Sequence, residues 1–168
     1  GDSLYYYQIE GTLIARQTMP GLMIDYPFIT MRGDQIDQFW YLDNAIAYRY
    51  GWTGVEALSG ARTIAECDPE TSSGPFSSEQ YLTWTKKDDR GISHLYYGAI
   101  PASGMIEPIE INYSTDLISY PQILFNPAKN NEPATIDLVW TEDVGDEPQR
   151  YNIYYLNLPI TEVAPTYT

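Results

Sequence analysis

The chain has 168 residues, 43% of them hydrophobic and 19% charged, which is typical of a folded globular protein rather than a disordered one. Lys and Arg number 9 against 23 Asp and Glu, which gives a formal net charge of −14. This charge disfavours direct binding to nucleic-acid phosphates or anionic lipid, and no apolar run approaches the ~20 residues of a membrane helix. We therefore expect a single β-rich domain over residues 1–168 without membrane insertion.

Tyrosine is the most unusual feature of the composition. The chain has 16 Tyr beside 4 Trp and 4 Phe, whereas Lys occurs only at positions 86, 87 and 129. Tyr suits half-buried strands, because its ring packs while its hydroxyl reaches water, and it is common on recognition surfaces. The composition favours an extracellular, cell-surface or virion-surface β-protein.

The first half of the chain gives mixed signals. Residues 4–9 and 12–17 predict two strands around Gly11, and the apolar run 22–31 predicts an edge or bent strand because it contains Pro27. Residues 35–47 predict a helix, since apolar side chains recur at helical spacing.

Two further segments complete that half. Residues 55–66 predict a second short helix, although Gly60 weakens the pattern. Residues 68–78 (DPETSSGPFSS) predict a long internal loop.

The second half predicts strands more clearly. Residues 81–86 alternate, with Leu82 and Trp84 on one face, and residues 92–100 return after the turn signal DDRG, which together predict a hairpin. Four more strands are predicted over residues 109–113, 121–125, 135–141 and 150–158. Residues 159–168 predict an extended C-terminal tail.

Alternation in the strand 135–141 places Ile136, Leu138 and Trp140 inward. We find no internal sequence repeat. The predicted fold class is mainly β, or α+β with one or two short helices, in an antiparallel β-sandwich or jelly-roll-like domain.

The first four residues, Gly1 to Leu4, resemble the nucleophile block of the GDSL hydrolases. In that family an Asp-x-x-His near the C-terminus completes the catalytic triad. The single histidine here, His94, lies mid-chain with Gly91 three residues before it. We interpret the match as coincidental and predict that the protein is not an enzyme.

Metal and cofactor sites are not expected. One cysteine, Cys67, and one histidine exclude a Cys-rich zinc site and any His pair. The acidic cluster 142–147 (EDVGDE) lacks the spacing of an EF-hand, and it suits either a calcium-binding loop or a solvated hairpin loop.

The candidate binding residues are Tyr48, Tyr50 and Trp52, which alternate along one predicted strand. If exposed, they would form a stacking platform for a sugar ring or a protein partner, and if buried they belong to the core. Burial is the ordinary fate of large aromatic side chains.

Three functions compete. The first is a structural or adhesive subunit of an extracellular filament, a secretion or conjugation apparatus, or a virion, binding other protein subunits, itself included, through exposed strand edges. The second is a carbohydrate- or ligand-binding module that uses surface Tyr and Trp. The third is an acidic mimic of nucleic acid that blocks a basic protein.

Overall fold

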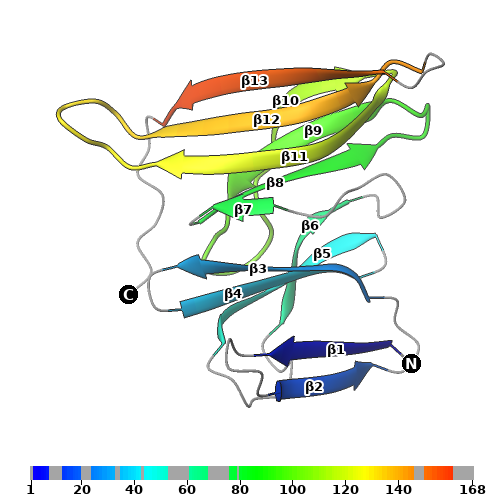
Figure 1. Ribbon diagram of the computed structural model, residues 1–168, viewed down its shortest axis with the longest axis vertical. Coiled ribbons are helices and arrows are strands. Elements are labelled where there is room, and N and C mark those ends of the chain that lie inside the picture. The colour runs from blue at the N-terminus through cyan, green and yellow to red at the C-terminus, as the bar shows by residue number, and fades with distance from the viewer. Residues whose placement is uncertain are drawn as a thin grey trace.

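The chain is described here from a computed structural model (Figure 1), and every regular element in its described residues is a β-strand. The mainly-β fold class is therefore confirmed. The described backbone covers residues 2–7, 13–19, 24–32, 35–42, 44–52, 61–67, 76–78, 80–145 and 150–160, and side chains are described for 28–30, 37–41, 44–50, 61–67, 78, 80–145 and 150–160.

The strands form four antiparallel sheets, and each strand pairs with its neighbours in sequence. The first sheet is β1 (Asp2–Tyr7) and β2 (Leu13–Met19); the second is β3 (Ile24–Arg32), β4 (Gln35–Leu42), β5 (Ala45–Trp52) and β6 (Arg62–Glu66). The third is β7 (Phe76–Ser78), β8 (Tyr81–Lys87), β9 (Ser93–Ala99) and β10 (Ile109–Ser114); the fourth is β11 (Leu117–Asn126), β12 (Thr135–Asp143) and β13 (Tyr151–Pro159).

The sheets are stacked in chain order, with β1–β2 at one end and β11–β13 at the other (Figure 1). Two hydrophobic cores join the three larger sheets. The first core lies between β3–β6 and β7–β10, and the second lies between β7–β10 and β11–β13. Because consecutive meanders face one another, the fold takes the sandwich form rather than the jelly-roll form.

Strand β8 is buried on both faces. Leu82 and Trp84 point into the first core, as their alternation predicts. Thr83 and Thr85 point to the other face and are also fully buried. The Thr83 hydroxyl donates to the main-chain oxygen of Tyr96 at 2.8 Å, which satisfies one of these buried polar groups.

The predicted hairpin over residues 81–100 is confirmed as β8 and β9. Its turn is held by Asp88, whose carboxylate accepts from the main-chain N–H groups of Arg90 and Ile92 at 2.9 Å. Gly91 has φ +80°, a left-handed conformation that glycine adopts without strain.

The helix predicted over residues 35–47 is wrong. That segment forms β4 and the start of β5, which pair antiparallel with Leu42 opposite Ala45. Phe39, Trp40 and Tyr41 are consecutive buried residues, because both faces of β4 are covered. Burial on two faces removes the alternation that identifies a strand, and the remaining apolar run imitates a helix.

Other predictions in the first half have mixed outcomes. The run around Pro27 is an edge strand, β3, whose register shifts between Asp25 and Phe28. The C-terminal part of the predicted helix 55–66 is instead strand β6, and residues 53–60 lie outside the described residues. In the predicted loop 68–78, residues 76–78 form β7 and residues 68–75 are not described.

A structural repeat relates the three larger sheets, although the sequence showed none. Trp40, Trp84 and Trp140 each lie buried on the second strand of their sheet. Trp84 stacks on its cross-strand partner Tyr96 with ring centroids 5.8 Å apart, and Trp140 stacks on Tyr154 at 5.5 Å. Cross-strand aromatic pairs of this kind stabilise a sheet by roughly 0.2–1 kcal/mol each.

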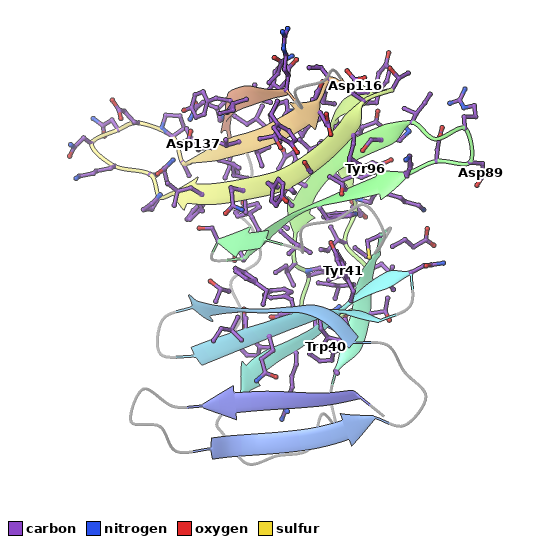
Figure 2. All side chains as sticks on the ribbon, turned by 45° about the vertical axis from the view of Figure 1, so that its right-hand side comes forward. Trp40, Tyr41, Asp89, Tyr96, Asp116 and Asp137 are labelled. Carbon is purple, nitrogen blue, oxygen red and sulfur yellow. The ribbon has the colours of Figure 1, made fainter. Side chains whose placement is uncertain are left out.

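All three tryptophans point toward the preceding element of the stack. Trp84 belongs to the first core and Trp140 to the second. Trp40 lies on the opposite face of β4 from the first-core residue Tyr41, on the side of β1–β2 (Figure 2). We call this side of each sheet the tryptophan face.

The opposite side of each sheet, its forward face, also repeats. In each of these three sheets the third strand carries an aliphatic residue directly before the cross-strand partner of the tryptophan. These equivalent residues are Ile46, Leu95 and Ile153. Ile46 packs in the first core and Leu95 in the second, so the next sheet covers both.

We predict that truncating the covered and the uncovered members of this set has unequal effects. Leu95→Ala should lower the free energy of unfolding by about 2–5 kcal/mol, because it leaves a cavity in the second core. Ile153→Ala, the matched variant, should lower it by less than about 1 kcal/mol, because Ile153 is exposed. Urea denaturation measures both free energies of unfolding, and equal losses would contradict the difference in burial between Leu95 and Ile153.

Candidate functional site

The forward face of β11–β13 is an exposed apolar surface. Ile153 is 76% exposed, whereas its equivalents Ile46 and Leu95 are 0% exposed. Tyr155 is 63% exposed, whereas its equivalent Tyr48 is 2% exposed. The same positions that are buried between sheets elsewhere in the stack are therefore open to water on the last sheet.

Further apolar side chains enlarge this surface. Tyr151 shares the alternation of Ile153 and Tyr155 on β13 and is exposed, and Leu124 of β11 lies directly across from Asp137 on the same face. Large contiguous exposed apolar surfaces are uncommon on monomeric proteins and mark interaction sites.

A polar group at the centre of this face also has a buried equivalent. Asp137 of β12 (Figure 2) accepts hydrogen bonds from the Tyr155 hydroxyl at 2.8 Å and from the Asn157 amide at 2.6 Å. In the β3–β6 sheet the Tyr48 hydroxyl donates to Asp37 at 3.3 Å, and both residues are buried beneath the next sheet. The carboxylate is therefore compatible with a covered face, because its acceptor capacity is already used.

These hydrogen bonds shift the acid–base behaviour of the pair. The amide of Asn157 and the hydroxyl of Tyr155, followed by the amide of Asn126, lower the pKa of Asp137 by stabilising the carboxylate. The hydrogen bond to Asp137 in turn raises the pKa of Tyr155, since the neutral hydroxyl is the donor.

Two of the three residues predicted as a binding platform, Tyr48 and Tyr50, have described side chains. Tyr48 is buried in the first core, with its ring 5.0 Å from that of Phe39. Tyr50 is about half exposed. Trp52 ends β5, and its side chain lies outside the described residues.

A separate cavity of about 220 Å³ opens at the edge between β3–β6 and β7–β10. Its lining comes from Ala65, Glu66, Trp84, Lys86, Tyr96, Met105, Ile106 and Pro108. Lys86 and Glu66 form an ion pair at 2.6 Å, which lowers the pKa of Glu66 and raises that of Lys86. This site can receive a small apolar or aromatic group beside a paired charge.

His94 of β9 lies between two carboxylates. Its Nδ1 is 3.4 Å from Glu110 and its Nε2 is 3.7 Å from Asp88. The ring also stacks on Tyr96 with centroids 6.0 Å apart. Ser3, the serine of the GDSL match, lies within strand β1, whose side chains are not described.

The acidic cluster at residues 142–147 is only partly a solvated loop. Glu142 is buried, and its carboxylate accepts from the Asn112 amide at 2.7 Å and from the indole N–H of Trp140 at 3.2 Å. Across the residues with described side chains, no group of three or more His, Cys, Asp or Glu residues is placed to hold a metal ion. Within the described ranges, no helix is both long and apolar enough to cross a bilayer.

Comparison with models of protein families, with curated proteins and with solved structures found no match to this chain.

We predict that removing one donor to Asp137 raises the pKa of its carboxyl toward the ordinary value. Tyr155→Phe deletes the hydroxyl that donates at 2.8 Å, and Tyr151→Phe on the same strand is the control. An NMR titration of the side-chain carboxyl carbons measures the change. The Asp137 carboxylate stabilises the fold fully above the pKa of this carboxyl in the unfolded chain, and the stabilisation is lost as the pH falls through the lower folded pKa. Tyr155→Phe should therefore reduce the difference between the folded and unfolded pKa of Asp137. An unchanged titration of Asp137 would contradict the assigned hydrogen bond from Tyr155.

Proposed function

We propose that the chain is a non-enzymatic structural or adhesive subunit of an assembly, and that it contacts other protein subunits through the forward face of β11–β13. The observation that carries this proposal is the exposure of Ile153 beside the complete burial of its equivalents Ile46 and Leu95. Covering one such side chain contributes about 1.5–3 kcal/mol, so a contact on this face has a substantial driving force.

The charge of the chain determines the conditions under which such contacts form. A net charge of −14 repels like copies at low ionic strength. The Debye length falls to ~3 Å at 1 M salt, so repulsion is screened there while the apolar face stays attractive. An extracellular, cell-surface or virion-surface location belongs to the same proposal and is supported by the Tyr-rich, Lys-poor composition.

A ligand-binding module is the second candidate, and the cavity beside Trp84 and Tyr96 favours it. Its aromatic and apolar lining suits a small ring-shaped ligand such as a sugar. Quenching of Trp fluorescence by members of a glycan panel would support this function. No response across the panel would remove its carbohydrate form.

An acidic mimic of nucleic acid has less support. Mimicry requires a dense exposed stripe of carboxylates, since DNA carries one charge per ~1.7 Å of axis. Asp37 and Glu142 are buried, which takes two carboxylates out of any such stripe.

We predict concentration-dependent association through the forward face. Light scattering in 1 M NaCl should give the wild-type chain a molar mass that rises above 19.1 kDa with concentration. Ile153→Asp should weaken this association at least tenfold, or about 1.4 kcal/mol, whereas Ile109→Asp, at an exposed Ile on β10, should not.

The opposite result is a 19.1 kDa monomer at every concentration and salt level. It would overturn the structural-subunit proposal and favour the ligand-binding module.

A further inference from the structure

Within the described residues, the fourth sheet has three strands, whereas the second and third sheets have four each. In those sheets the third strand pairs antiparallel with a fourth, β5 with β6 and β9 with β10. Among the described strands, β13 pairs with β12 alone. Its other edge therefore presents main-chain N–H and C=O groups without a described strand beside them.

Strands β6 and β10 share a specific irregularity. In β6 the register skips Ile64, because Ile46 pairs with Ala65 and Ala47 pairs with Thr63. In β10 the register likewise skips Ile111, because Leu95 pairs with Asn112 and Tyr96 pairs with Glu110. The extra residue is thus an isoleucine at the same repeat position in both sheets, which is a β-bulge that redirects the side chain.

The bulged isoleucine contributes to the core ahead of its sheet. Ile64 is fully buried in the first core, and Ile111 packs against the second core. By the repeat, the corresponding residue beside β13 would lie next to Ile153 and cover part of the forward face.

Each fourth strand also holds the next sheet with polar contacts. The main-chain oxygen of Ile64 accepts from the N–H of Ile106 at 2.7 Å, and Glu66 pairs with Lys86. In β10, the Asn112 amide donates to the buried Glu142 of β12. A fourth strand therefore adds polar contacts to the hydrophobic packing between one sheet and its successor.

We propose that the free edge of β13 binds an extended polypeptide segment as a fourth, antiparallel strand. The segment carries a bulged isoleucine or similar aliphatic residue opposite Ile153 and Tyr154, preceded by a polar residue as in β6 (RTIAE) and β10 (IEINYS). Main-chain hydrogen bonds supply affinity, and the aliphatic side chain supplies specificity. This site is distinct from the whole-face contact proposed above, although it adjoins it.

The proposed segment belongs to another polypeptide, because the two strands of this chain that carry the bulged isoleucine, β6 and β10, are already paired in their own sheets. The connections from β5 to β6 and from β9 to β10 span residues 53–61 and 100–108, nine residues each. Residues 160–168, which follow β13, equal that connection in length. In a second copy of the chain β6 and β10 are already paired, so it offers edge-to-edge pairing of β13 instead.

The test uses the full chain with the β10 hexapeptide, Ile-Glu-Ile-Asn-Tyr-Ser, appended after Thr168. Residues 160–168 then supply the nine-residue connection, and tethering gives the hexapeptide an effective concentration in the millimolar range. The matched control carries Asp in place of the second Ile of the appended hexapeptide. Amide hydrogen exchange is followed over β13, with β8 and β9 reporting that the chain is folded.

We expect the extension to slow exchange of the edge-facing β13 amides at least tenfold and the Asp control to slow it much less. Exchange over β13 equal to that of the unextended chain, with β8 and β9 still protected, would overturn the proposal. If exchange of the β13 amides in the unextended chain slows as the protein concentration rises, the proposal would also be overturned, since a second copy would then occupy the edge.

The outcome is separable from that of the proposed function. Edge protection in a chain that stays monomeric supports strand addition and contradicts face-mediated self-association. Association without protection of the β13 edge supports face-mediated self-association and contradicts strand addition.

Discussion

A sheet that is apolar on both sides must be covered on both sides, and the third sheet, β7–β10, imposes this constraint on the whole chain. Leu82 and Trp84 of β8 require a cover on one side, and Leu95 of β9 requires one on the other. The sheets before and after it supply these covers, so the fold grows as a stack in which each unit buries the face of its neighbour.

The exposed features of the molecule follow from that stacking. The last sheet repeats the forward-face isoleucine or leucine and tyrosine of the other two, and it also repeats the Tyr–Asp hydrogen bond of the second sheet. No sheet among the described residues covers Ile153 and Tyr155. In the part of the chain that the structure describes, the last sheet has no fourth strand, whereas β6 and β10 complete the second and third sheets. The exposed face and the open edge of β13 among the described strands therefore adjoin one another on the same sheet.

The sequence predicted the second half of the fold better than the first, because alternation survives where one face stays partly wet. The hairpin 81–100 and the inward positions of Ile136, Leu138 and Trp140 are confirmed. The helix over 35–47 failed where burial on both sides of β4 hid the alternation. A tryptophan followed further along the chain by an Ile/Leu-x-Tyr pattern occurs in each of the three sheets and is a sequence signal for the repeat, but connections of unequal length obscure it. The exposure of Ile153 depends on how the sheets stack, which no local sequence pattern encodes.

Thiol reactivity tests the central claim most directly, because the one natural cysteine, Cys67, is buried. Single Ile46→Cys, Leu95→Cys and Ile153→Cys variants report the same repeat position in three sheets. The account predicts that the thiol at position 153 reacts with Ellman's reagent at the rate of a free thiol, while those at positions 46 and 95 react only as the chain opens. Equal reactivity at positions 95 and 153 in a folded chain would contradict it.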